Sequence, residues 1–212
     1  MAHEKDLRWR KFYDGWAPRY DLSIRLWALL WGFSDAVERR KMVDRLELRP
    51  GQRVLEVSVG TGSNLPFVAE KAGSEGRIVG LDISPGMLRQ CRRKSAALSI
   101  ERDLIEGEGA HLPFPDDTFD ALLHFGGINE FGDKRAAIDE MLRVAKPGAR
   151  IVIGDEGLRP RERHSLRRRL LLKINKLYAH GPPLDLLPPD AKDLRVDYFR
   201  GDACYLIDFT KP

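Results

Sequence analysis

Short apolar runs and longer mixed segments alternate along the chain beyond residue 50. Short apolar runs bounded by turn residues are typical of buried strands, whereas apolar residues three or four apart indicate helices. The runs predict strands at 53–58, 77–82, 101–106, 119–124 and 149–155. The segments around and between them predict helices at 64–72, 85–97, 133–145 and 165–179. Two further runs, at 194–200 and 203–209, flank Gly201-Asp202 and predict a hairpin.

Alternation of strands and helices over this length favours a parallel sheet that is covered on both faces. We therefore expect an α/β fold with a seven-stranded, mostly parallel sheet, helices on both faces and a C-terminal antiparallel hairpin. Pro50-Gly51 separates a helical N-terminal part, residues 1–48, from a core of residues 49–212, within one compact domain. Ligands of such sheets bind at the carboxyl ends of the strands, near the switch in strand order.

Composition and charge are compatible with this fold, and they limit the class of protein and its cellular compartment. Hydrophobic residues make up 42% and charged residues 32%, which is typical of a globular protein and argues against bulk disorder. Two cysteines, Cys91 and Cys204, are too few for a disulfide framework or a zinc site, and we expect no metal. This low number of cysteines is compatible with the reducing environment of the cytoplasm. The longest apolar run, residues 26–33, is too short to span a bilayer.

The stretch VLEVSVGTGSN, residues 54–64, runs from a strand through a glycine turn into a helix. Gly60 and Gly62 allow close backbone approach, and Asp82 ends the next strand, where a carboxylate can accept from ribose hydroxyls. A purely structural glycine turn with a capping acid would look similar. The turn lacks the Lys of a phosphate loop, and Leu65 stands where a dinucleotide fingerprint has a third glycine or alanine. Glu56 would repel a pyrophosphate and suits a cofactor with an ammonium and a sulfonium, such as S-adenosyl-L-methionine.

Six segments in order carry a family resemblance: FYDGWAPRYD, VLEVSVGTGSN, VGLDISPGML, EGEGAHLPFPDDTFD, FGGINEFGDKRAAIDEMLRVAKPGARIVI and DACYLIDFTKP. Together they resemble the class I S-adenosylmethionine-dependent methyltransferases, and within them the ubiquinone/menaquinone C-methyltransferase-like branch. The resemblance implies a Rossmann-like fold in which residues 1–48 form a helical lid. One departure is Ser58, where the family usually has glycine. A serine can keep the turn with an extended backbone, and its hydroxyl could either bond the cofactor or narrow the pocket.

The resemblance also implies which residues hold the cofactor. Glu56, Gly60 and Gly62 surround its methionine end, while Asp82 binds the ribose hydroxyls. The remaining residues flank the adenine, line the turn or belong to the lid. The full set of implied cofactor-binding residues is Tyr13, Tyr20, Glu56, Ser58, Gly60, Gly62, Asn64, Asp82, Ile83, Met87, Glu108, Gly109, Ala110, His124 and Phe125.

Methyl transfer needs a base only if the acceptor must lose a proton. His124, at the end of the fourth predicted strand, is the first candidate by position, although a histidine there can also pack beside the cofactor without moving protons. Glu130 in the following loop and Tyr20 in the lid are the other catalytic candidates.

Two segments bear on the acceptor. Residues 22–33 are rich in Trp and Leu, which indicates either packing on the core or an apolar mouth for a lipophilic acceptor. The predicted helix 165–179 has Leu166, Leu170, Ile174 and Leu177 on one face among basic residues. That face either packs on the sheet or contacts an anionic membrane surface.

We therefore expect a methyltransferase of a small acceptor that is lipophilic or amphipathic, such as a quinol or a phospholipid amine. A soluble metabolite as acceptor and a catalytically silent cofactor-binding module are the alternatives. Nucleic acid is disfavoured because residues 124–131 read HFGGINEF rather than the Asn/Asp-Pro-Pro-aromatic stretch of base methyltransferases. The proline-rich residues 180–190 replace a longer acceptor-covering region of the quinone branch, which predicts a more open pocket.

Overall fold

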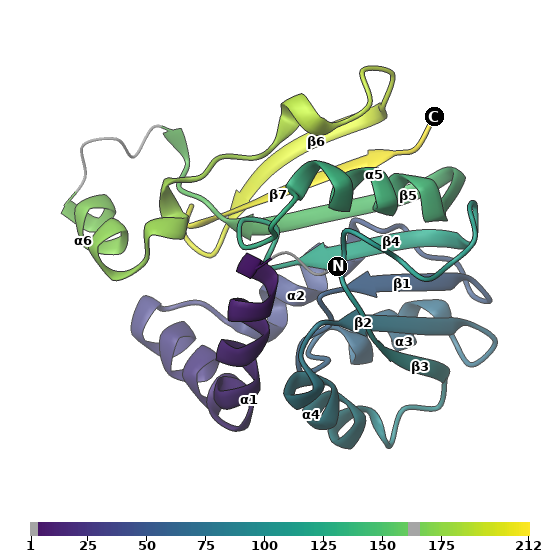
Figure 1. Cartoon of the computed structure of the whole chain (residues 1–212), viewed down its shortest axis with the longest axis horizontal. Helices are drawn as coiled ribbons and strands as arrows, with labels where there is room; N and C mark the ends of the chain where they lie inside the picture. The colour runs from purple at the N-terminus through teal and green to yellow at the C-terminus, as the bar shows by residue number, and fades with distance from the viewer. Residues whose placement is uncertain (1–3, 161–165) are drawn as a thin grey trace.

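A seven-stranded sheet forms the centre of the molecule, as the sequence predicts (Figure 1). The computed structural model describes residues 4–160 and 166–212, and the side chains of residues 166–168 are outside that description. The strands are β1 (Arg53–Val57), β2 (Arg77–Asp82), β3 (Glu101–Glu106), β4 (Phe119–Phe125), β5 (Ala145–Glu156), β6 (Lys192–Phe199) and β7 (Cys204–Thr210).

The order of the strands is β3-β2-β1-β4-β5-β7-β6. The first five are parallel, and β7 lies antiparallel between β5 and β6, which confirms the C-terminal hairpin. The order changes direction between β1 and β4. Val57 pairs with Leu81 of β2 and with His124 of β4, so the carboxyl ends of these three strands lie level at the switch point. Ligands of such sheets bind at this edge.

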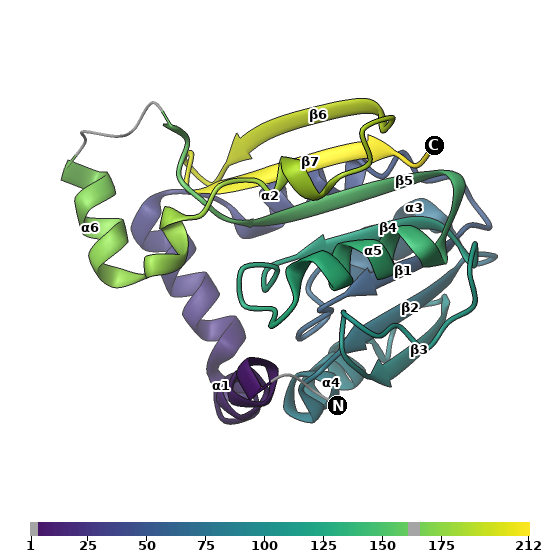
Figure 2. The same cartoon turned by 45° about the horizontal axis from the view of Figure 1, so that its top comes forward.

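Helices cover both faces of the sheet (Figure 2). One apolar cluster joins a sheet face to α2, α3 and α4, and a second cluster joins the other face to α5. The helices are α1 (Glu4–Trp31), α2 (Asp35–Asp44), α3 (Leu65–Ala72), α4 (Pro85–Ser95), α5 (Lys134–Val144) and α6 (Leu166–Ile174), with short 3₁₀ turns η2 (Lys176–Ala179) and η3 (Leu184–Leu186). Because buried side chains alternate between the two clusters along each strand, neighbouring residues of one strand point to opposite faces.

The predicted helix 165–179 is wrong in its extent. Ser165 lies outside the described residues, and α6 ends at Ile174. Asn175 then accepts a hydrogen bond from the backbone N–H of Leu177 through its side chain, at 2.9 Å, and begins the separate turn η2. Asparagine side chains compete with the helix ladder in this way. A second difference is that β5 begins at Ala145, four residues before the predicted strand 149–155.

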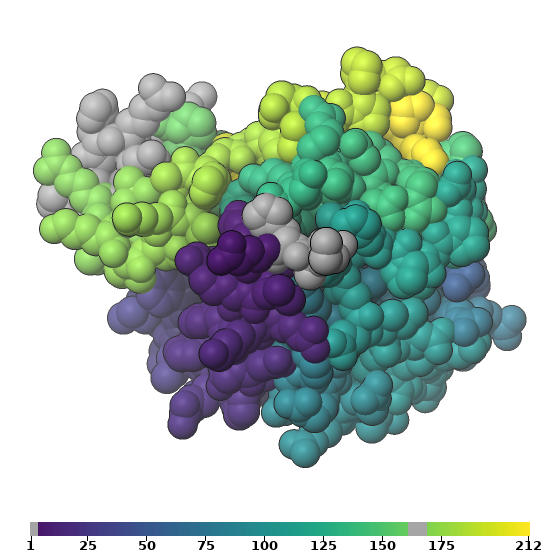
Figure 3. All heavy atoms as spheres, viewed as in Figure 1, coloured from purple at the N-terminus to yellow at the C-terminus, as the bar shows by residue number. Residues whose placement is uncertain are grey.

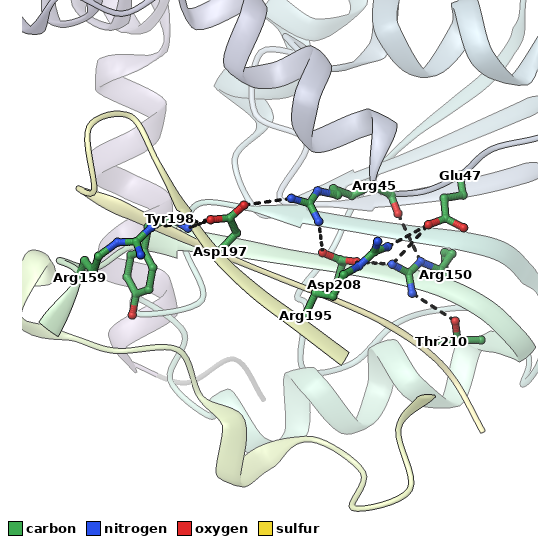
Figure 4. A network of polar contacts seen from close by, with 9 residues as sticks. All are labelled: Arg45, Glu47, Arg150, Arg159, Arg195, Asp197, Tyr198, Asp208 and Thr210. Atoms are coloured by element: carbon green, nitrogen blue, oxygen red, sulfur yellow. Dashed lines mark hydrogen bonds and ion pairs between the residues drawn. The ribbon is translucent and has the colours of Figure 1, made fainter. Parts of the chain in front are cut away.

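A buried carboxylate holds the C-terminal hairpin to the rest of the sheet (Figure 4). Asp208 of β7 has no solvent exposure and accepts from three guanidinium groups, those of Arg150 on β5, Arg195 on β6 and Arg45 after α2. Glu47 accepts from Arg195 as well. Three regions that are distant in sequence, the end of α2, β5 and the hairpin, therefore meet at one buried negative charge.

Helix α1 lies across the open end of the sheet, and its first half contacts α4 and the loop after β4 (Figure 1). In Figure 3 the purple atoms of α1 form a ridge between the green atoms of α6 and the teal atoms of the core. Trp27 and Trp31 near the end of α1 pack with Leu171 of α6 and Tyr178 of η2. Within the described residues, no helix combines the length and the apolar character needed to cross a membrane.

Candidate functional site

The glycine turn after β1 has three residues in the left-handed backbone region. Ser58 has φ 58°, Gly60 has φ 56° and Gly62 has φ 75°. The expectation that Ser58 keeps an extended backbone is therefore wrong, because the turn itself requires a positive φ at this position. Glycine adopts that conformation without cost, whereas another residue loses about 1–2 kcal/mol. Ser58 is thus a strained residue at the edge of the site.

Close packing and one carboxylate fix the rest of the turn. A Cβ at Gly62 would lie 2.6 Å from the sulfur of Cys91 on α4, so only glycine fits there. Asp82, at the end of β2, accepts from the backbone N–H of Gly60 at 2.8 Å and from that of Ser84 at 2.9 Å. Burial raises the pKa of Asp82 to about 6. One carboxylate therefore joins the turn after β1 to the start of α4.

An open cleft lies at the switch point, between α1 and the carboxyl ends of the strands, with an empty space of about 900 Å³ including its mouth. The predicted residues that line it are Tyr13, Tyr20, Ser58, Gly60, Asp82, Ile83, Met87, Glu108, Gly109, Ala110, Phe125 and Glu130. Further lining residues, among them Asp6, Trp9, Phe131 and Glu156, were not predicted.

His124 does not line the cleft, contrary to expectation. Strand alternation turns its ring to the α5 face of the sheet, where it has no solvent exposure and packs 5.3 Å from the ring of Phe131. Its Nδ1 lies 3.0 Å from the carbonyl oxygen of Val57, and burial lowers its pKa to about 4. Phe131 lines the cleft in its place. His124 is therefore a neutral core residue, and we do not retain it as a base.

Glu56 and Asn64 also lie behind the turn rather than in the cleft, on the opposite face of the sheet from His124. Asn64 donates to one carboxylate oxygen of Glu56 at 2.6 Å and accepts from Arg39 of α2 at 2.9 Å. The second carboxylate oxygen of Glu56 is buried and has no hydrogen-bond partner among the described residues. Burial raises the pKa of Glu56 to about 7. A buried acceptor without a partner suits a cationic or donating ligand group next to the turn.

A tyrosine and two carboxylates form the other end of the cleft. The hydroxyl of Tyr13 donates to Oε2 of Glu130 at 2.7 Å, and the ring of Tyr20 lies 6.5 Å from that of Tyr13. Burial raises the pKa of Glu130 to about 7, and the nearby charge of Glu156 acts in the same direction. Glu130 was predicted, but Glu156 was missed because it directly follows a run that reads only as a buried strand.

Two acids of α1, both overlooked in the sequence, attach this helix to the core. Asp14 accepts from the hydroxyl of Ser84 and from the backbone N–H of Gly86, each at 2.7 Å. Asp21 accepts from the hydroxyl of Thr61 at 2.6 Å and from Lys94 at 2.7 Å. The signal was present in FYDGWAPRYD, where the pairs Tyr-Asp recur seven residues apart on one face of a helix.

The fold and the cleft together define an α/β protein with a ligand site at the switch point of its sheet, built from a glycine turn and a strand-terminal acid. Residues 54–148 match the family described as methyltransferase domain. This segment is therefore similar to methyltransferase domains, and the fold is the one found in a solved SAM-dependent methyltransferase of Aquifex aeolicus, at 23% identity with a TM-score of 0.59. This segment contains the turn and Asp82 but neither α1 nor the end of β5.

Among its relatives, a demethylmenaquinone methyltransferase of Thermus thermophilus is 40% identical over 138 residues, which cover 65% of this chain and 60% of the relative. A ubiquinone/menaquinone biosynthesis C-methyltransferase of Geobacter sulfurreducens is 40% identical over 154 residues, covering 71% and 58%. The chain thus spans somewhat more than half the length of these curated relatives. The crystal structure of a SAM-dependent methyltransferase of Thermotoga maritima aligns with a TM-score of 0.65, at 21% identity, over 92% of this chain and 97% of that one.

Proposed function

We propose that the protein binds S-adenosyl-L-methionine in the cleft and transfers its methyl group to a small lipophilic or amphipathic acceptor, such as a quinol or a phospholipid amine. The observation that carries the proposal is the carboxylate of Asp82, which lines the cleft while it holds the backbone of Gly60. Relatives named as quinone methyltransferases support a quinol only loosely, because the match leaves much of their length uncovered.

The lining residues fit this cofactor. Asp82 is placed to accept from two ribose hydroxyls, and Ile83 and Met87 offer apolar contacts to an adenine. Glu108 is available to accept from the adenine amino group, beside Gly109, which also lines the cleft. The free oxygen of Glu56 and the acidic lining favour a ligand with positive charge. When bound, the cofactor supplies an activated methyl group on a sulfonium.

Binding titrations with Asp82 variants test the cofactor assignment. We expect Asp82→Ala to weaken binding of S-adenosylmethionine by roughly 1–3 kcal/mol through loss of charge-assisted hydrogen bonds. Asp82→Asn keeps the size of the side chain and one of its two acceptor oxygens, so it should lose affinity and one of the two backbone contacts, to Gly60 or to Ser84. Asp139→Ala, an exposed acid on α5, is the matched control. Unchanged affinity in both Asp82 variants, or saturable binding of NAD instead of S-adenosylmethionine, would refute the assignment.

The outer side of α1 supports peripheral contact with an anionic membrane. Exposed leucines form a stripe along its second half: Leu22, Leu26, Leu29 and Leu30. Exposed Arg19 and Arg25 flank this stripe, and Asp21, the acid within it, is bound to Thr61 and Lys94. An apolar stripe with basic flanks is the pattern of a helix that lies in a membrane interface.

Helix α6 also has exposed apolar residues, on the face for which the sequence left packing on the sheet and membrane contact open. Leu171, which is not on the predicted apolar face, is buried against α1. Leu170 and Ile174, which are on that face, are exposed at 51% and 54%. Exposed Arg169 and Lys173 lie beside them, and the sequence of α6 has no acidic residue. This arrangement favours the membrane-contact interpretation over packing of that face on the sheet.

Flotation with vesicles tests the membrane contact. We expect binding to vesicles of anionic phosphatidylglycerol, weaker binding at high salt, and no binding to purely zwitterionic vesicles. Replacing both Leu29 and Leu30 with Glu should weaken binding by about tenfold or more. Leu184→Glu, at an exposed position on η3, is the control. Absence of vesicle binding by the unchanged protein would refute this part of the proposal.

The acceptor class is tested by label transfer from methyl-labelled S-adenosylmethionine to a cell extract, followed by partition of the products. Label in the organic phase supports a quinol or lipid acceptor. Label in the aqueous phase supports a soluble metabolite instead. Cofactor binding without transfer to any fraction supports the silent module.

A further inference from the structure

The charges that line the cleft have one sign. Five carboxylates face it, those of Asp6, Asp82, Glu108, Glu130 and Glu156. Among the residues that the structure describes, no Lys, Arg or His lines the cleft. S-adenosylmethionine has a net charge of only about +1 near neutral pH, so this lining stays acidic once the cofactor is bound. An acidic lining attracts cations and repels anions.

Three of these carboxylates gather around the loop after β4. Asp6 of α1 accepts from the backbone N–H of Gly132 at 2.8 Å. Glu130 belongs to the loop itself and is only 7% exposed, while Glu156 ends the neighbouring strand β5. Asp155, which precedes Glu156 on β5, holds the loop by accepting from the backbone N–H of Asn129 at 2.8 Å. The carboxylate of Glu130 therefore has a fixed position at the wall of the cleft.

Glu130 also lies next to the glycine turn. A Cβ at Gly127 would be 3.9 Å from Oε2 of Glu130 and 3.6 Å from the hydroxyl of Ser58. Gly127, with φ 101°, therefore lies near both the Glu130 carboxylate and the Ser58 hydroxyl and places no side chain between them. A ligand atom held by Glu130 would therefore lie beside the turn where the cofactor is proposed to bind.

Resting on the proposed function, we infer that the end of the cleft formed by Tyr13, Glu130 and Glu156 is an acceptor site for a primary or secondary amine. Glu156 and Asp6 attract the ammonium form, and Glu130 takes its proton. The neutral nitrogen then forms the N–C bond with its lone pair as the S–C bond breaks toward sulfur. The products are a methylated ammonium and a neutral thioether, and Glu130 releases its proton to solvent.

The same lining disfavours a quinol. A quinol reacts after it loses its phenolic proton, and the phenolate present before methyl transfer needs a nearby cation or donor for stabilisation. The charged or titratable groups facing Glu130 are Tyr13 and Lys5 from α1 and Glu156 from β5. Lys5 donates to the backbone carbonyls of Asn129 and Phe131, at 3.2 and 2.9 Å, and does not line the cleft. The Tyr13 hydroxyl donates to Glu130.

A set of acceptors that share one alkyl chain and differ in head group tests the inference. The probes are dodecylamine, 4-dodecylphenol and dodecanoic acid, with phosphatidylethanolamine vesicles and a short water-soluble amine to separate a lipid source from a free amine. We expect methyl transfer to an amine with a kcat/KM at least about tenfold above that of the phenol, because one favourable charge pair is worth that much. Methylation of the phenol in preference to every amine would overturn the inference.

Variants and direct binding separate the acceptor site from the cofactor site. In the presence of S-adenosylhomocysteine, Glu156→Gln should weaken amine binding about tenfold in calorimetry. Glu130→Gln should lower kcat/KM for the amine about 100-fold and remove the rise of kcat/KM with pH near 7. Both should leave the Kd of the cofactor within about twofold, as should the control Asp139→Asn.

Two outcomes would overturn the acceptor site while leaving the proposed function intact. One is loss of cofactor affinity in Glu130→Gln with unchanged amine binding, since Glu130 would then hold the cofactor. The other is unchanged amine binding and turnover in both Glu130→Gln and Glu156→Gln. Failure of the unchanged protein to bind the cofactor at all would refute the proposed function itself, and with it this inference.

Discussion

Replacing Asp14 with alanine should release α1 from the core without unfolding the sheet. The single oxygen Oδ1 of Asp14 accepts from the hydroxyl of Ser84 and from the backbone N–H of Gly86, both at 2.7 Å. These two residues begin α4, whose first turn contains no acidic residue of its own. Asp14 therefore supplies the negative charge that a helix N-terminus favours, from a different helix.

The size of the effect follows from these contacts. Loss of hydrogen bonds to a charged group, together with the favourable position at a helix N-terminus, should cost about 2–3 kcal/mol. Asp14→Asn keeps one acceptor oxygen and loses only the charge, so it should cost about 1 kcal/mol. The helices approach so closely that a Cβ at Gly86 would lie 2.9 Å from the same oxygen.

Hydrogen exchange measured by mass spectrometry distinguishes local release from global unfolding. Peptides from residues 4–31 should exchange about 30-fold or more faster in Asp14→Ala, whereas peptides from β1 and β4 should exchange as before. Affinity for the cofactor should fall as well, because α1 carries the cleft residues Tyr13 and Tyr20. Glu4→Ala, an exposed acid in the same helix, is the control. Equal exchange of α1 in Asp14→Ala and the unchanged protein would refute the anchoring role, and equal acceleration in the sheet would show a global effect instead.

Three further predictions concern stability. Ser58→Gly should raise the free energy of unfolding by about 1 kcal/mol in urea denaturation, because Ser58 has φ 58°. A loss of stability would contradict this prediction and would mean that a contact of the Ser58 hydroxyl stabilises the fold by more than the backbone strain costs. Burial raises the pKa of Glu56 from 4.5 to about 7, so the ligand-free protein should lose stability as pH rises between those values. Glu56→Gln should flatten this pH dependence, and an unchanged profile would contradict the assignment. Asp208→Asn should destabilise by about 3 kcal/mol because it removes the buried anion that pairs with buried Arg150. Thermal unfolding at the same temperature as the unchanged protein would contradict this prediction.

The sheet could be predicted because each strand is a short apolar run with its own turn residues. The strands 77–82 and 101–106 match β2 and β3 to the residue, and the hairpin is confirmed. The predicted helix 165–179 was wrong because periodicity cannot detect a competing side-chain cap such as that of Asn175. Periodicity also could not show that Leu171 would be buried and Leu170 exposed, since α6 packs on α1 rather than on the sheet.

Inside the sheet, one step along a strand decides whether a side chain reaches the site. Glu56 was assigned to the cofactor for its charge and by the family resemblance, and His124 for its position at a strand end. The pleat turns them to opposite faces, beneath Asn64 in one case and beneath Phe131 in the other. Glu130 could be predicted better because it lies in a loop beyond the strand end, where no alternation applies.

The residues at one end of the cleft are close together in the sequence, whereas those at the other end are far apart. The cofactor end comes mainly from residues 54–64 and the end of β2, which are contiguous motifs within the matched methyltransferase domain. The acceptor end joins α1, the loop after β4 and the end of β5, and both Tyr13 and Glu156 lie outside residues 54–148. The match to the methyltransferase domain thus covers the proposed cofactor end, whereas of the residues at the proposed acceptor end it includes Glu130 but neither Tyr13 nor Glu156. Because an acceptor is selected by the groups that surround its reacting atom, the carboxylates of Glu130 and Glu156 carry more weight for its identity than the relatives' names.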